Sequence, residues 1–166
     1  MTAYEVLWNG WRANYVSAER SGGHSTFTNI LNSGLDDELT HIVHRSSTCF
    51  AIMNAYPYSA GHLLVVPYRE VPSLLDLDAA EHDDLWCTVR DGVAAIVHEY
   101  EPAGVNVGIN MGAAAGGSIG EHLHVHVVPR WVGDSNFMTA VAQTRTIPEA
   151  LDASASRIRS SWPTAD

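Results

Sequence analysis

The stretch Gly116–Trp131 reads GGSIGEHLHVHVVPRW and places three histidines, His122, His124 and His126, at alternate positions. Leucine or valine occupies the position after each histidine. Alternate side chains of a strand point to one face, so this spacing predicts a row of imidazoles on one face and buried aliphatic side chains on the other. The stretch therefore predicts a strand that carries a histidine cluster.

The rest of the chain divides into short segments with the patterns of strands and helices. Apolar runs between turn residues predict strands at 41–46, 49–55, 62–68, 105–110 and 122–128. Helices are predicted at 25–34, closed by a glycine, and at 148–159, with Leu151, Ala155 and Ile158 facing inward. Most of the strands follow one another directly. The pattern predicts an α+β fold with an antiparallel sheet of about five strands.

A long helix is predicted between the third and fourth strands. Asp78 and Glu81 have the spacing of a capping box, and Pro102 ends the helical pattern. Apolar residues recur at helical spacing within this segment, which favours packing on the core over contact with a cofactor. They are Leu85, Val89, Val93, Ile96 and Tyr100.

Composition limits the classes of function. A chain of 166 residues with 46% hydrophobic content is typical of one compact domain. The formal net charge of −10 argues against binding to nucleic acid or to a membrane surface, because both usually require basic patches. Cys49 and Cys87 are far apart and predict neither a disulfide nor a cysteine metal site. With no secretion signal at the start, the sequence predicts a cytoplasmic protein.

Three interpretations of the histidine row are open on residue chemistry alone. The imidazoles could ligate zinc, they could be structural, or one of them could attack phosphorus while the others hold the phosphate. The segment from Asn110 to Gly120 is rich in small residues, whose backbone N–H groups can approach phosphate oxygens closely. The order of strand, small-residue loop and histidine strand favours phosphate chemistry.

The chain resembles the histidine triad nucleotide hydrolases and transferases. The family pattern His-φ-His-φ-His-φ-φ, where φ is hydrophobic, matches His122–Val128 and is followed here by Pro129 and Arg130. A second family block resembles NAYPYSAGHLLVVPYREV, with family residues at Asn54, Gly61, His62 and Pro67. The segment GINMGAAAGGSIGEH is similar to a third block, with Gly117 in place of the usual glutamine.

The resemblance implies a domain organisation and an assembly. It implies a single domain over 1–166, made of an N-terminal arm (1–24), a core (25–136) and a C-terminal extension (137–166). Family members usually dimerise through the long helix and a strand edge, so a homodimer is the minimum expectation and a tetramer is the alternative. Related bacterial members carry a Cys-x-x-Cys pair before the first strand, whereas GGHSTFTNIL contains no cysteine. No structural zinc is therefore expected.

The resemblance also assigns site residues. His124 would attack the α-phosphorus through Nε2, with its Nδ1–H held by a backbone carbonyl, and His122 and His62 would support this arrangement. His126 would bind the α-phosphate. The nucleotide and phosphate contacts that the resemblance implies for the other residues fall on Asn54, Asn110, Gly117 and Ser118, with capping of the turn as the alternative role of Asn54. Trp131 directly follows Pro129 and Arg130 and could stack on a base or line the phosphate pocket, because aromatic faces recognise nucleobases; packing in the core or an interface is the alternative.

The words LWNGWRANY and PRWVGDSNFM are similar to the actinobacterial diadenosine tetraphosphate phosphorylases. This likeness implies transfer of an adenylyl group through adenylyl-histidine to inorganic phosphate, which would yield ADP and ATP. A dinucleoside polyphosphate hydrolase or an AMP-phosphoramidase would share the site, and a non-catalytic nucleotide-binding protein is an alternative of another class. No tightly bound cofactor is expected, although a divalent cation can accompany the nucleotide.

Overall fold

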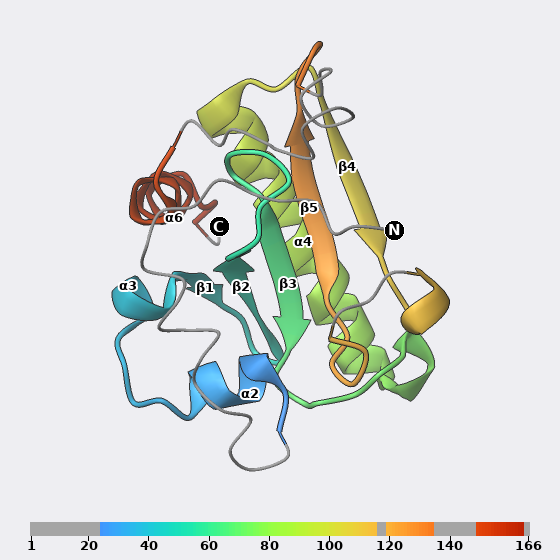
Figure 1. Ribbon diagram of the computed structural model, residues 1–166. Helices are drawn as coiled ribbons and strands as arrows, with labels where there is room; N and C mark the ends of the chain where they lie inside the picture. Colours follow the sequence, from blue (N-terminus) through green and yellow to red (C-terminus); the bar gives the residue numbers. More distant parts are fainter. Residues whose placement is uncertain (1–23, 116–118, 135–148, 165–166) are drawn as a thin grey trace, which may run out of the picture.

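The computed structural model describes residues 24–115, 119–134 and 149–164. Its centre is an antiparallel five-stranded sheet in the order β1-β2-β3-β5-β4, which confirms the predicted α+β class (Figure 1). Each strand is short, and each pairs with its neighbours in antiparallel register. The strands are β1 (Ile42–Arg45), β2 (Cys49–Met53), β3 (Leu63–Pro67), β4 (Gly104–Ile109) and β5 (Val125–Arg130).

The described helices are α2 (Thr26–Leu31), α3 (Asp37–Thr40), α4 (Ala79–Tyr100) and α6 (Leu151–Ser160). Short 3-10 turns cover Leu74–Asp76 and Ala113–Ala115. The first predicted helix is shorter than expected, because Asn32 caps it before Gly34, and the short α3 was not predicted. The last helix begins at Leu151, while Pro148 lies outside the described residues, as does nearly all of the predicted arm.

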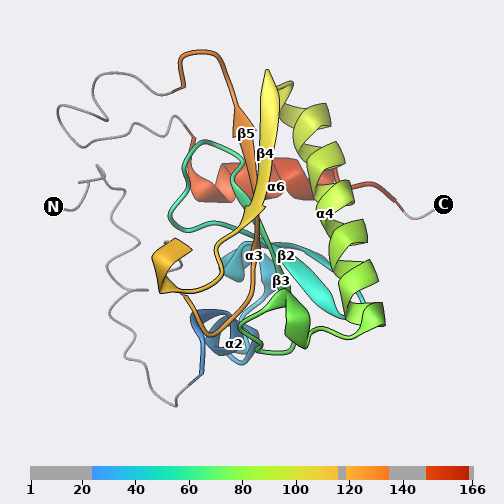
Figure 2. The same cartoon turned by 90° about the vertical axis from the view of Figure 1, so that its right-hand side faces the viewer.

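Helix α4 covers one face of the sheet, as its apolar spacing predicts (Figure 2). Asp78 and Glu81 form the predicted capping box, and the helix ends at Tyr100 before Pro102. Its apolar stripe meets the side chains on one face of the central strands and forms the larger core with them. That core includes Leu63, Val65, Leu85, Ile96 and Val127.

The opposite face of the sheet is covered only in part. Over β2 and β3, Phe27 of α2 packs on a second core cluster that contains Phe50 and Leu64. The same face of β4 and β5 is not covered by a described helix (Figures 1 and 2). His126 and Arg130 of β5 line a pocket on this uncovered half of the sheet, whereas His122 and His124 pack near Phe27 of α2.

The histidine segment departs from the predicted strand. Strand β5 begins only at Val125, so His126 lies in the ladder while His122 and His124 precede it. Both ladders of β5 end at Val125, which pairs with Val65 of β3 and Ile109 of β4. Before it, the Leu123 N–H donates to the Val71 carbonyl, and the His122 side chain donates to the Pro67 carbonyl. The predicted buried aliphatic face is confirmed, because Leu123, Val125 and Val127 are buried. His122 and His124 are buried as well.

Candidate active site

His124 is held by the backbone just before it. Its Nδ1 lies 2.9 Å from the carbonyl oxygen of His122, which can only accept, so Nδ1 carries the proton. In a neutral ring the lone pair then belongs to Nε2, and no described residue hydrogen-bonds to that atom. The ring is 6% exposed and packs near Phe27 and His126. The geometry leaves a fixed imidazole with one free nucleophilic nitrogen.

His122 is fixed from both sides and is fully buried. Its Nε2 lies 2.8 Å from the carbonyl oxygen of Pro67 and therefore donates. Its Nδ1 then accepts from the Ser25 hydroxyl at 2.6 Å. Because both ring nitrogens are engaged, the His122 backbone that holds His124 is fixed as well. His122 therefore supports His124 through its main chain.

Sequence reasoning did not identify the cluster that holds His122. Ser25 caps α2 by accepting from the Thr28 N–H, and its own N–H donates to the Glu70 carboxylate at 2.9 Å. The Thr28 hydroxyl donates to the same carboxylate at 2.7 Å. The contacts of Ser25 and Thr28 with Glu70 and His122 join residues 42 to 97 positions apart, and no local sequence pattern joins them. The one local indication in the sequence was Ser25 itself, because serine is a preferred residue at the N-cap of a helix.

His62 orients His126 through a hydrogen bond between their rings. The Tyr58 N–H donates to His62 Nδ1 at 2.9 Å, so His62 Nε2 carries the proton and donates to His126 Nδ1 at 3.0 Å. His126 Nε2 then carries the remaining proton and has no partner among the described residues, although the atom is buried. A buried donor without a partner is costly, which makes it suited to an oxygen of a bound ligand. The Tyr58 ring stacks on His126.

Burial lowers the pKa of all three alternate histidines, because an imidazolium is poorly solvated there. For His126 the pKa falls to about 4, with the neighbouring His124 ring as a further cause. For His122 and His124, hydrogen bonds to the carbonyls of Pro67 and His122 oppose the shift in part. At neutral pH the three rings are therefore uncharged.

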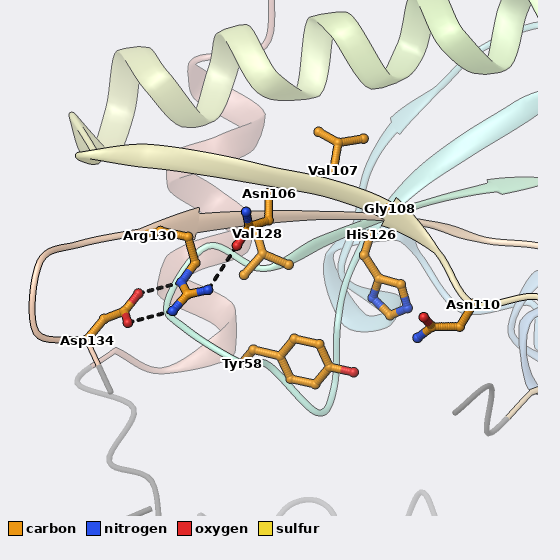
Figure 3. A pocket seen from close by; sticks show the side chains of 9 residues that line it. All are labelled: Tyr58, Asn106, Val107, Gly108, Asn110, His126, Val128, Arg130 and Asp134. Atoms are coloured by element: carbon orange, nitrogen blue, oxygen red, sulfur yellow. Dashed lines mark hydrogen bonds and ion pairs between the residues drawn. The ribbon is translucent and has the colours of Figure 1, made fainter. Parts of the chain in front are cut away.

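A pocket of about 290 Å³ opens beside His126 on the uncovered face of β4 and β5 (Figure 3). Alternate residues of β5 and three consecutive residues of β4 line it, and Tyr58 forms the opposite wall. Arg130 and Asp134 form an ion pair at the end remote from His126. The lining residues are Tyr58, Asn106, Val107, Gly108, Asn110, His126, Val128, Arg130 and Asp134.

Of the other predicted contact residues, Asn110 lines the pocket and Asn54 does not. Asn110 lines the pocket next to His126 (Figure 3). Asn54 is buried, its Oδ1 accepts from the Tyr56 N–H at 2.8 Å, and its amide nitrogen lies 3.3 Å from His62. These contacts are those of a turn-forming asparagine.

Trp131 is not among the residues that line the pocket. Its ring lies edge-on to Tyr100 of α4, and its backbone N–H donates to the Asp134 carboxylate. Gly117 and Ser118 lie outside the described residues. Within the described ranges no group of three His, Cys, Asp or Glu side chains has the arrangement of a metal site, and no helix is long and apolar enough to cross a membrane.

Comparison with known sequences identifies a matching domain family and similar proteins from other organisms. The sequence model of the HIT domain matches residues 37–132. An AP-4-A phosphorylase of Mycobacterium tuberculosis is 40% identical over 94% of this chain and 83% of its own length. An asymmetrical bis(5'-nucleosyl)-tetraphosphatase of Schizosaccharomyces pombe is 36% identical over 57% of this chain and 52% of its own length.

Solved structures agree with the sequence comparison. A histidine triad nucleotide-binding protein from Sulfolobus tokodaii superposes with a TM-score of 0.67 at 30% identity, over 82% of this chain and 90% of that one. A HIT-like protein from Bartonella henselae has the same fold, with a TM-score of 0.69 at 24% identity over 84% of this chain and 97% of that one. By its domain match, its relatives and its fold, the chain belongs to the HIT domain family.

Proposed function

We propose that this protein transfers an adenylyl group from diadenosine tetraphosphate to inorganic phosphate. In the first step His124 Nε2 attacks the α-phosphorus, a P–N bond forms, and the bond to the bridging oxygen breaks to release ATP. The observation that carries the proposal is the fixed tautomer of His124, whose Nδ1–H is held by the His122 carbonyl. This leaves a nucleophile that is neutral at physiological pH.

The surrounding donors match the charge that develops on phosphorus oxygens. The unpartnered Nε2–H of His126 is suited to a non-bridging oxygen of the α-phosphate or to the departing oxygen. Asn110 is the neighbouring amide in the same pocket. The predicted roles of Gly117, Ser118, Asn54 and Trp131 in nucleotide binding remain part of the proposal.

In the second step an oxygen of inorganic phosphate attacks the adenylyl-histidine. The new P–O bond forms as the P–N bond breaks, which yields ADP and restores neutral His124. Phosphate is favoured over water because the M. tuberculosis relative, which aligns with 94% of this chain, is named a phosphorylase. The related tetraphosphatase and triphosphatase names favour water as the alternative acceptor.

Product analysis tests the acceptor. The protein is incubated with diadenosine tetraphosphate with and without phosphate, and the nucleotides are separated by chromatography. ADP and ATP in equal amounts, formed only with phosphate, are the expected result. AMP and ATP formed at the same rate without phosphate would identify a hydrolase. Nucleotide binding without either product would identify a non-catalytic binding protein.

The proposed assembly is a homodimer formed through β4. The outer side of β1 is protected, because Arg159 of α6 donates to the Ile42 carbonyl and α6 packs against the strand. Strand β4 is the other edge of the sheet, and most of its residues are exposed, including Val107 at 43%. An open edge strand pairs readily with another strand, and a second copy of β4 would extend the sheet.

A further inference from the structure

The pocket has a second polar end that the proposed chemistry does not use. Arg130 lies four residues beyond His126 in β5, so the two side chains emerge from the same face of the sheet. Along a strand this separation is about 13 Å. Figure 3 shows Val128 between them and Tyr58 on the opposite wall. The pocket therefore runs along the strand from an imidazole to a guanidinium, farther than one phosphate group extends.

Arg130 is held in place but keeps donors for a ligand. Its Nε and one terminal nitrogen donate to the two oxygens of Asp134 at 2.6 and 2.7 Å, and its other terminal nitrogen donates to Asn106 at 2.9 Å. A guanidinium has five N–H groups, so two are left after these three bonds. The structure thus supplies an oriented fork that can still bind an anion.

The exposure of the pair favours an anionic ligand. The Arg130 side chain is 45% exposed and the Asp134 side chain is 15% exposed, so a ligand meets the guanidinium before the carboxylate. Arg130 is also the one side chain with a permanent positive charge among the described residues that line the pocket. In a chain with a net charge of −10, a polyphosphate needs such a local cation.

We propose that Arg130, oriented by Asp134 and Asn106, binds the distal phosphates of the leaving nucleotide and thereby favours long polyphosphate chains. The inference rests on the proposed function, which puts the α-phosphate at His124 and His126. A donor with several phosphates reaches Arg130, whereas an adenylyl donor with one phosphate does not. Arg130 is a specificity residue, because it touches the substrate away from the reacting atoms.

The test compares two donors on the wild type and on Arg130→Gln. For diadenosine tetraphosphate we expect kcat/KM to fall roughly 10- to 100-fold, mainly through KM, as one charged hydrogen-bonding group is lost. For adenosine 5'-phosphoramidate, which has one phosphate, we expect the same kcat/KM in both proteins. Arg130→Lys keeps the charge without the fork, so its kcat/KM for the tetraphosphate should be intermediate.

Arg45→Gln is the matched control. Arg45 also ends a strand and forms a bidentate pair, with Asp37, but it does not line this pocket. Arg45→Gln should therefore leave kcat/KM unchanged for both donors. An equal loss on both donors in Arg130→Gln, with an unchanged circular dichroism spectrum, would overturn the inference. If Arg130→Gln does not fold, Arg130→Lys serves for the same comparison between donors.

Failure of the proposed function would look different. In that case the wild type would turn over neither donor, and the inference would be decided by calorimetry with inorganic tripolyphosphate. Weaker binding to Arg130→Gln than to the wild type and Arg45→Gln would support an anion subsite at Arg130. Equal binding to all three proteins would refute it.

Discussion

At the scale of single residues, the tautomers follow from one another. The Tyr58 N–H sets the protonated nitrogen of His62, and His62 in turn sets that of His126. On the other side, the His122 carbonyl sets that of His124. His124 is left with a lone pair on Nε2, and its neighbour His126 is left with an N–H at Nε2 that has no partner among the described residues. A nucleophile beside a donor is what displacement at phosphorus requires.

Replacing the nucleophile should remove turnover without removing the fold. We expect His124→Ala to lower kcat for diadenosine tetraphosphate by at least about 10³-fold, because it deletes the attacking nitrogen. Nucleotide binding, measured by calorimetry, should change little. His82→Ala, at an exposed histidine of α4, is the control and should be fully active. Retention of more than a tenth of the activity by His124→Ala would contradict the mechanism.

The lowered pKa values predict the pH dependence. An ordinary histidine titrates near pH 6.5, whereas burial keeps His124 and His126 neutral below that pH. The acid limb of kcat should therefore lie below pH 6.5. In the same window the unfolded chain binds protons that the folded chain does not, so stability falls as the pH drops from about 6.5 towards 4. Rate profiles and urea titrations check both statements; an acid limb above pH 7 would contradict the first.

At the scale of elements, α2 is tied to the site by its N-cap residue, Ser25. Ser25→Ala should remove the helix cap and the donor to His122, at a cost of about 1–3 kcal/mol in the free energy of unfolding. It should also lower kcat more than it raises KM, because the support of His124 is weakened. Ser25→Thr keeps the hydroxyl and should restore most of the rate. Equal kinetics for Ser25→Ala and the wild type would confine Ser25 to a capping role.

The turn before β3 depends on a glycine. Gly61 has φ of +75°, and a Cβ there would lie 2.8 Å from Cε2 of Tyr100. Gly61→Ala should therefore lower the free energy of unfolding by roughly 1–3 kcal/mol. It should also lower kcat, since the turn carries the Tyr58 N–H. Gly34→Ala is the control that has the backbone strain but no clash, because Gly34 has φ of +71° with open space around it. Equal losses of stability in the two variants would show that the Tyr100 side chain moves away from the new Cβ and that the clash adds no cost.

Elements with local signals could be predicted, while contacts between distant segments could not. The capping box at Asp78 and the apolar stripe of α4 are local, and the structure confirms them. The alternation of His122, His124 and His126 is also local, but it did not show where the ladder ends, because that depends on the pairing of β5 with β3 and β4. The contact of Ser25 with His122 joins residues 97 apart, so it became visible only in the folded chain.

At the scale of the whole molecule, the sheet has one protected edge and one open edge. Arg159 and α6 occupy the side of β1, whereas the described residues leave the outer side of β4 unpaired. The pocket is lined by β4, so pairing at this edge would fix one wall of the site. This links the proposed homodimer to the proposed activity: a β4 held in a longer sheet keeps Asn106 and Asn110 in place.

The dimer is tested by placing a charge on this edge. Sedimentation velocity should give the wild type the mass of two chains, and Val107→Lys should shift it to the mass of one, because burying a lysine in the strand pair is costly. Leu75→Lys, at a side chain that is 94% exposed on a 3-10 turn, is the control and should leave the dimer intact. A β4 freed from its partner should also raise KM for diadenosine tetraphosphate in Val107→Lys. A wild type that sediments as one chain at micromolar concentration would refute the homodimer.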